Sequence, residues 1–337
     1  MKALILALAW LAAAQPAPEP VAEPTPVEDE TGRIVRGTAA APDSAPWQIQ
    51  IYSTIPISAD KLAADRAMAP NDPAKRFYAE MQPWERDHVC GGVLIAPGWA
   101  LTAAHCFVDK KEQLKPFGSR RVRLGNVYLP SATEMAVDRV IVHADYRRMG
   151  DKRHDIALIR LVPDARTDPA VAAFARPVRL WPATRGPHGV GAQMKVTGWG
   201  ATGEREAGAL RDVDGKAMRG SPLLLEAQQQ LVDPARCRAV KTYRRTLWDG
   251  VMCIAGDATG QDACQGDSGG PLTRQQFLVG LVSTGTGCGL KGVPALYTRV
   301  DSYAAWIDTA MAQSTGAVVA RCRLDPRAPR PALACSP

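Results

Sequence analysis

The chain has 337 residues, of which 46% are hydrophobic and 22% charged, and its formal net charge is +7. This composition is ordinary for a folded protein with a hydrophobic core, and it excludes a chain that is disordered throughout. No long heptad or apolar run follows residue 14, which excludes coiled coils and multispan membrane proteins. The basic residues do not cluster with aromatic residues, so the positive charge indicates a solvated surface and no nucleic-acid partner.

The first 33 residues have the composition of a leader. Lys2 precedes an apolar run, residues 3–14, that ends in the small residues typical of a signal-peptide cleavage site. This run is too short to span a hydrocarbon core about 30 Å thick, so we expect a signal peptide at 1–14 and not a membrane anchor. Residues 15–33 contain five prolines and five acidic residues, which predicts an extended pro-segment. Export permits disulfides among the eight cysteines.

From Trp47 onward the chain consists of short apolar runs separated by turn residues, which favours an all-β barrel or sandwich. The predicted strands are 47–52, 91–95, 121–129, 139–143, 156–162, 193–198, 223–231, 277–284 and 296–300. One helix is predicted, over 303–312, where Trp306 and Ile307 are apolar on one side. The Pro-rich stretch 167–187 is a candidate linker between two halves.

Three motifs carry residues that can act together in nucleophilic catalysis. They lie at residues 90–92 with 101–106, at 154–158 and at 262–271. A serine hydroxyl needs a base to remove its proton, and a carboxylate behind the base fixes its tautomer. Ser268, His105 and Asp155 can fill these three roles. The glycines around Ser268 predict a tight turn that aims the N–H groups of Gly266 and Ser268 at one point, where an oxyanion would be stabilised.

Each motif alone also has a structural interpretation, because a histidine beside a cysteine and an acid beside a strand are common. Their occurrence together in the order His, Asp, Ser favours catalysis. With these motifs the chain resembles the trypsin-like, or chymotrypsin-fold, serine proteases over residues 34–313. The resemblance implies an all-β fold of two packed six-stranded antiparallel Greek-key β-barrels with a short C-terminal helix. The first barrel would carry His105 and Asp155, and the second Ser268. The excess of Arg over Lys, 30 to 11, indicates a GC-rich bacterial genome.

The cysteines follow the family pattern in part. The resemblance implies three disulfides: Cys90–Cys106, Cys237–Cys253 and Cys264–Cys288. It offers no partner for Cys322 and Cys335, which lie in the Pro-rich tail 314–337, and we predict that these two close a terminal loop. Metal binding is the alternative for clustered Cys and His. No C-x2-C spacing is present and the calcium loop of the family is not matched, so we expect no metal and no other cofactor.

Residues 33–37 resemble a zymogen activation site. In the family, cleavage before the residue at the position of Ile34 frees an α-amine, which pairs with the acid preceding the serine, here Asp267. The resemblance therefore predicts activation by cleavage after Arg33. The alternative is that Ile34 and Val35 only begin a strand.

The specificity pocket is expected around Asp262, six residues before Ser268, where trypsin-like enzymes place an acid. A buried carboxylate there selects Arg, then Lys, at P1, the residue whose carbonyl carbon is attacked. Ser283 and Gly285 resemble the strand that binds the substrate backbone, and Ser283 would also support the catalytic acid. Ala295 stands where the family has a pocket-wall glycine, so we expect a narrower pocket.

An insertion of about 53–89 lengthens the first barrel, and residues 60–87 have a helical composition. It could restrict substrates or bind a partner, and inert decoration is the alternative.

These features predict a secreted serine endopeptidase, periplasmic or extracellular, made as a zymogen. Its expected partners are protein or peptide substrates and protein protease inhibitors, with no nucleic acid and no membrane insertion after signal removal, and it is expected to be a monomer. Two alternatives stay open. One is a catalytically silent homologue acting as a binding module, and the other is a protease of different P1 preference because Ala295 narrows the pocket.

Overall fold

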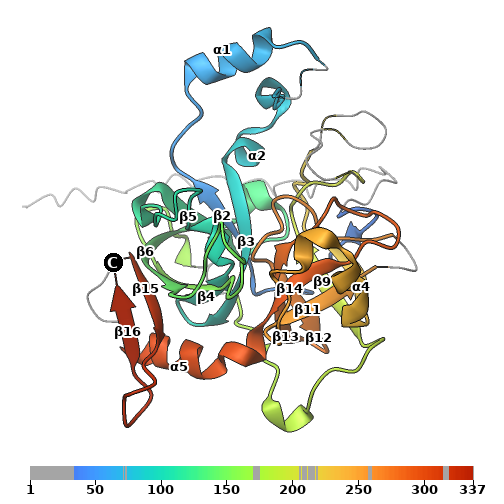
Figure 1. Ribbon diagram of the computed structural model, residues 1–337. Helices are drawn as coiled ribbons and strands as arrows, with labels where there is room; N and C mark the ends of the chain where they lie inside the picture. The colour runs from blue at the N-terminus through green and yellow to red at the C-terminus, as the bar shows by residue number, and fades with distance from the viewer. Residues whose placement is uncertain are drawn as a thin grey trace, which may run out of the picture. The chain divides into compact units, whose positions relative to one another are not determined.

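Two closed β-barrels make up the described part of the chain (Figure 1). The computed structural model describes residues 34–70, 72, 74–169, 175–204, 206, 211, 217, 219–256, 260–313 and 319–336. The predicted signal peptide, 1–14, and pro-segment, 15–33, lie outside these residues. Within the described ranges, no helix is both long enough and apolar enough to cross a membrane.

Both barrels have six antiparallel strands in the same spatial order. Around the first barrel the strands are β2 (Gln48–Ser53), β3 (His88–Ala96), β4 (Trp99–Thr102), β7 (Ala157–Val162), β6 (Thr133–His143) and β5 (Arg120–Leu124), which closes on β2. Around the second they are β9 (Gln193–Gly198), β10 (Leu225–Leu231), β11 (Val251–Ala255), β14 (Ala295–Arg299), β13 (Phe277–Thr284) and β12 (Pro271–Arg274), which closes on β9. The order is therefore first, second, third, sixth, fifth, fourth in each, a Greek-key arrangement. The predicted fold class is confirmed.

The strands form where side chains can fill a barrel interior. Ile49 and Ile51 of β2 are fully buried, and so are Val196 of β9 and Leu272 of β12. Along β6 the first residues alternate between buried and half-buried, the period-two pattern of a strand with one face on a core. Closed barrels leave no long unpaired edge, which stabilises sheets as short as these.

Further strands extend each barrel. β1 (Thr38–Ala39) pairs with β10, and β8 (Arg179–Leu180), inside the predicted linker 167–187, pairs parallel with β13. In the C-terminal tail, β15 (Val319–Leu324) pairs parallel with β6, and β16 (Leu333–Ser336) pairs antiparallel with β15. The tail is thus a β-hairpin added to the first barrel, where the sequence had suggested only a loop.

The helices of the described residues are short, and the longest is α5 (Ala304–Gln313) at 10 residues. It is the predicted C-terminal helix and buries Trp306 and Ile307. The other α-helices of the described residues are α1 (Ala59–Ala67), α2 (Pro83–Asp87) and α4 (Pro234–Ala239). Short 3-10 helices lie at Tyr78–Glu80, Ala104–Cys106, Phe117–Ser119, Leu129–Ser131, Ala183–Arg185, Lys241–Tyr243 and Val300–Tyr303.

Several predicted strand limits were wrong. The strand predicted over 121–129 ends at Leu124, because Gly125 adopts a φ of 81° and begins a turn. The strands β4, β11 and β12 were not predicted, since runs of four or five residues give too few periods to identify.

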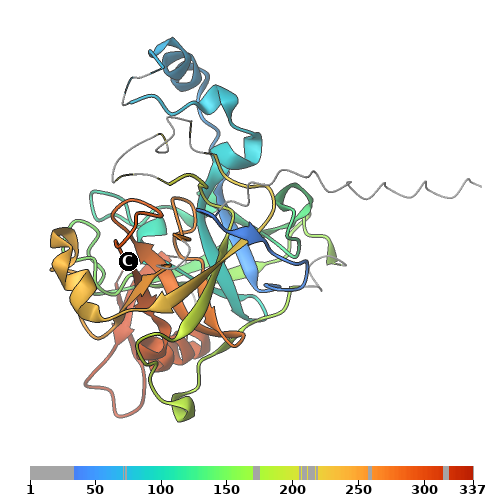
Figure 2. The same cartoon turned by 90° about the vertical axis from the view of Figure 1, so that its right-hand side faces the viewer.

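The insertion contains the helices α1 and α2 and folds on itself. Ser58 caps α1, and Pro83 begins α2 behind a capping box formed by Gln82 and Glu85. The buried Asp65 carboxylate accepts the backbone N–H groups of residues 76 and 78, at 2.5 and 2.9 Å. Figures 1 and 2 show α1 and α2 beyond the end of β3, which begins directly after α2.

Candidate active site

Asp155 is the centre of a hydrogen-bonded group between the two barrels. Its Oδ1 accepts the backbone N–H of His105 at 2.9 Å, and its Oδ2 lies 2.8 Å from Nδ1 of the same ring. The Ser283 hydroxyl, from β13 of the second barrel, donates to Oδ2 at 2.6 Å. Because an ionised carboxylate only accepts, Nδ1 carries a proton and Nε2 is free to act as a base.

The ionised state of Asp155 is stabilised although only 4% of its side chain is exposed. Burial alone would raise its pKa, but the charge of His105 and the hydrogen bonds from His105 and Ser283 outweigh burial and lower the pKa. The carboxylate therefore stays charged at neutral pH and can stabilise an imidazolium.

Ser268 lies in a turn that only glycine permits on either side. Gly266 and Gly269 have φ values of +98° and +78°, where a β-carbon is strained. A β-carbon on Gly269 would lie 2.2 Å from Thr102 Oγ1, and the Ser268 carbonyl accepts the N–H of Gly91 at 2.8 Å. The turn is thus locked against β3 and β4 of the first barrel.

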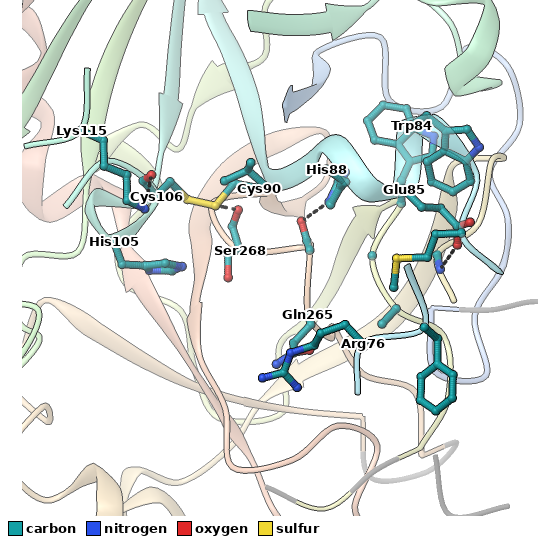
Figure 3. Close-up of a pocket in the computed structure, with 18 of the residues that line it drawn as sticks. Arg76, Trp84, Glu85, His88, Cys90, His105, Cys106, Lys115, Gln265 and Ser268 are labelled. Atoms are coloured by element: carbon teal, nitrogen blue, oxygen red, sulfur yellow. Dashed lines mark hydrogen bonds between the residues drawn. A yellow bond between two sulfur atoms is a disulfide. The ribbon is translucent and has the colours of Figure 1, made fainter. Parts of the chain in front are cut away.

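Ser268 and His105 line the same pocket, whose volume is about 440 Å³ (Figure 3). Among the described residues no hydrogen bond joins the Ser268 hydroxyl to His105, a separation that is common before substrate binds. The N–H groups of Gly266 and Ser268 donate to no backbone carbonyl of the described chain. Both donors are therefore available to a ligand.

Asp267 is completely buried beside the serine turn. Its Oδ1 accepts the N–H of Gly200 at 2.9 Å, and its Oδ2 accepts the N–H of Cys264 at 2.8 Å. A β-carbon on Gly198 would lie 1.9 Å from this carboxylate, so the neighbouring strand must carry glycine there. Burial raises the pKa of Asp267 to about 6. No cation pairs with it within the described ranges, so it is a strong candidate to receive one.

The segment after Arg33 is embedded in the second barrel, whereas Arg33 itself lies outside the described residues. Ile34 is fully buried in the barrel core, and Val35 pairs with Asp262 in an isolated bridge. Arg36 stays at the surface and forms an ion pair with Glu204 at 2.8 Å.

Asp262 is 9% exposed and its Oδ2 accepts the N–H of Gly289 at 3.0 Å. Burial raises its pKa to about 7. It lines a cavity of about 450 Å³ that differs from the pocket containing Ser268. A β-carbon built on Gly285 would lie 3.8 Å from the Ala295 methyl, so these two residues of the expected specificity pocket are neighbours.

Four disulfides are present, and they join the expected pairs: Cys90–Cys106, Cys237–Cys253, Cys264–Cys288 and Cys322–Cys335. The first ties β3 to the histidine turn, and the third ties the serine turn to the segment before β14. Among the described residues, Cys90, His105 and Cys106 bring ligand atoms within 4.8 Å of one another, but both sulfurs are bonded to each other and offer no thiolate to a metal.

His88 is a site residue that the sequence reasoning missed. Its Nε2 lies 2.8 Å from the Gly266 carbonyl oxygen, and its Nδ1 lies 2.6 Å from Gln50 Nε2. Burial lowers its pKa to about 4, so the ring is neutral at physiological pH. His88 lies two residues before Cys90, the residue that begins the first motif. This closeness to the motif is the signal that could have drawn attention to it.

The two-barrel fold is the one that the family resemblance predicted. The chain matches the Trypsin family model over residues 67–307 and belongs to that family. It is 36% identical to bovine coagulation factor XII over 250 residues, which are 70% of this chain and 38% of that protein. It is 32% identical to bovine tissue-type plasminogen activator over 289 residues, 82% of this chain and 44% of that protein. The chain thus spans less than half the length of these relatives.

Among solved structures the chain is similar to neuropsin, a serine protease expressed in the limbic system of mouse brain. The identity is 28% and the TM-score 0.58, and the match covers 83% of this chain and 98% of the neuropsin chain. These relatives are mammalian, and the bacterial origin suggested by composition stays a prediction.

Proposed function

We propose that the protein is a secreted serine endopeptidase that forms an acyl-enzyme on Ser268. One observation carries the proposal: the hydrogen-bonded series from Ser283 through Asp155 to His105 ends in the pocket that contains Ser268. Such a series orients a neutral histidine as a base toward a serine nucleophile.

In the acylation step, the Ser268 hydroxyl attacks the carbonyl carbon of the scissile bond while His105 Nε2 takes its proton. The negative oxygen of the tetrahedral intermediate accepts the N–H groups of Gly266 and Ser268. The imidazolium, stabilised by Asp155, then donates its proton to the leaving amine as the C–N bond breaks. In the deacylation step a water molecule repeats the attack, His105 takes the proton of that water, and Ser268 recovers its hydrogen when the acid product leaves.

Asp262 is proposed to select Arg, then Lys, at P1, with Ser283 and Gly285 binding the substrate backbone. Support comes from the burial of Asp262, whose carboxylate accepts N–H donors such as that of Gly289 and carries no cationic partner among the described residues. A different P1 preference is the alternative, because the Ala295 methyl lies beside Gly285 and Asp262 does not line the pocket that contains Ser268.

Activation by cleavage after Arg33 is proposed to free the α-amine of Ile34 for pairing with Asp267. The burial of both residues and the absence of a cation on Asp267 within the described chain support this step. The proposed protease domain spans residues 34–313. We also propose that the protein is secreted and monomeric, and that its partners are protein or peptide substrates and protein protease inhibitors.

The alternative is a catalytically silent homologue that acts as a binding module. Labelling by a phosphonylating reagent specific for activated serines separates the two, because only an active triad reacts. After cleavage at Arg33, we expect turnover of P1-Arg peptides that Ser268→Ala lowers by roughly 10⁴- to 10⁶-fold, with the thermal unfolding temperature unchanged. If the Ser268→Ala variant turned over these peptides as fast as the unsubstituted protein does, the mechanism would be excluded.

A further inference from the structure

The insertion forms one wall of the pocket that contains Ser268. Its described residues that line the pocket are Lys75, Arg76, Phe77, Met81, Trp84 and Glu85, followed by His88 and Val89 at its end. In Figure 3 the Arg76 side chain extends from the insertion toward Gln265, which belongs to the serine turn. The catalytic pocket is therefore built partly from a segment that none of the proposed catalytic steps uses.

This wall is fixed in place by contacts with distant parts of the chain. Glu85 pairs with Arg219 at 2.6 Å and also accepts the N–H of Gly220 at 3.1 Å. The Arg211 guanidinium lies 4.3 Å from the centre of the Phe77 ring. Because the segment is anchored at both Phe77 and Glu85, the pocket can be treated as pre-formed.

The pocket carries an excess of positive charge. Of the described residues that line it, four are cationic, namely Lys75, Arg76, Lys115 and Arg148, and Glu85 is the one acid. The Glu85 side chain is 6% exposed and is already neutralised by its ion pair.

None of the four cations forms an ion pair with a carboxylate among the described residues, and burial lowers the pKa of Lys115 to about 8. Lys75 donates to the carbonyl oxygens of Asp65 and Met68 at 2.9 and 2.8 Å, and Lys115 donates to that of Cys106 at 3.1 Å. Arg148 likewise donates to backbone carbonyl groups. Carbonyl oxygens orient these groups but do not cancel their charge. Arg76 is exposed and pairs with no carboxylate among the described residues, so it is the cation most open to a ligand.

The position of this pocket relative to Ser268 indicates which part of a bound peptide substrate would enter it. This step rests on the proposed function, in which the P1 side chain points toward Asp262 and Gly285. The peptide beyond the scissile bond must then leave Ser268 on the other side, over the Cys90–Cys106 disulfide, which lines the pocket. We propose that the pocket binds the leaving side of the substrate and selects an acidic residue within the three positions after the scissile bond. Arg76 is its main specificity-determining residue.

The test uses peptides that share P1 Arg and carry Glu, Gln or Lys at one of the three positions after it. For the protein cleaved after Arg33, we expect kcat/KM in the order Glu, Gln, Lys at one position or more, with about fivefold per step for a partly exposed ion pair. Arg76→Gln should bring the Glu-to-Lys ratio toward one, and Arg76→Glu should invert it. Arg66→Gln is the matched control, because Arg66 is exposed on the same insertion but does not line the pocket.

A binding measurement keeps the inference testable without turnover. On Ser268→Ala protein, an acidic tripeptide amide should bind more tightly than its Lys counterpart, and the difference should shrink at high ionic strength. Cleavage with equal rates for Glu and Lys peptides, together with equal binding, would overturn this inference and leave the proposed function intact. No cleavage of any P1-Arg peptide would instead overturn the proposed function, and the binding ratio would still decide the inference.

Discussion

His88 Nε2 donates a hydrogen bond of 2.8 Å to the carbonyl oxygen of Gly266, a residue 178 positions later in the chain. The Gln50 amide nitrogen donates to the opposite ring nitrogen, and its oxygen accepts from Arg123 at 3.0 Å. Since Gln50 donates to Nδ1, the ring proton must be on Nε2. His88 therefore restrains Gly266, whose own N–H is one of the two proposed oxyanion donors.

Replacing His88 should lower kcat more than it changes KM. We expect His88→Ala to reduce kcat about tenfold, the equivalent of one hydrogen bond that holds a donor used in the transition state. His88→Gln should recover part of the loss, because its amide can donate to the same carbonyl. Steady-state kinetics on P1-Arg peptides, with thermal unfolding as a check on folding, measure both effects. A rise in KM with kcat unchanged would contradict the positioning role.

The relationship between His88 and Gly266 also shows what the sequence could reveal. Ser268, His105 and Asp155 were predicted because each lies in a short motif whose chemistry is local. The contact of His88 with the serine turn joins two barrels, and no periodicity or spacing encodes a contact between residues 178 positions apart.

The same limit applies to the insertion and the tail. The helical composition of residues 60–87 was readable, but its place in the active-site pocket depends on the pairing of Glu85 with Arg219, which lies 134 positions away. The strand β15 joins β6 through a parallel pairing of Val319 with Val140. Such pairings depend on how the finished barrel exposes an edge, and this is a property of the tertiary structure.

Activity of the cleaved protein should fall at alkaline pH if the Ile34 α-amine must stay charged. Burial raises the pKa of Asp267 to about 6, and no cation offsets this burial within the described residues. A free α-amine has a pKa of about 7.7–8.0 in the unfolded chain, and pairing with this carboxylate raises it. The active form is then present below the raised value and is lost as the pH rises through it. A pH profile of kcat/KM that stays flat to roughly pH 11, or full activity without cleavage after Arg33, would argue against the pairing.

Preference for P1 Arg should itself depend on pH through Asp262. Burial raises the pKa of this carboxyl to about 7, so below that pH it is neutral and offers no charge to a guanidinium. The ratio of kcat/KM for P1 Arg to that for P1 Leu should therefore rise with pH through about 7. The ratio cancels the pH effects that the two substrates share, because both are attacked by the same catalytic groups. Asp262→Asn should make the ratio small and independent of pH, and an unchanged ratio in this variant would contradict the role of Asp262.

Arg should be cleaved faster than Lys at P1. The guanidinium can meet the Asp262 carboxylate through a bidentate fork, whereas the shorter Lys needs a bridging water and a neighbouring hydroxyl. Ala263, which follows Asp262, supplies no hydroxyl, so a bound ammonium keeps one donor poorly satisfied. An unsatisfied buried donor costs about 1–3 kcal/mol, which corresponds to a difference of about tenfold or more in kcat/KM.

Ala263→Ser is the variant that isolates this cause. It restores a hydroxyl next to Asp262, so it should raise kcat/KM for Lys peptides while leaving Arg peptides nearly unchanged, and the Arg-to-Lys ratio should fall toward one. If the Ala295 methyl narrows the pocket as we propose, it does so for both side chains and does not alter the direction of the comparison. The measurement is kcat/KM on matched peptides that differ only at P1. Lys cleavage as fast as Arg cleavage in the unsubstituted protein would refute the hydroxyl argument, and efficient cleavage after Phe or Leu would remove Asp262 from the specificity pocket altogether.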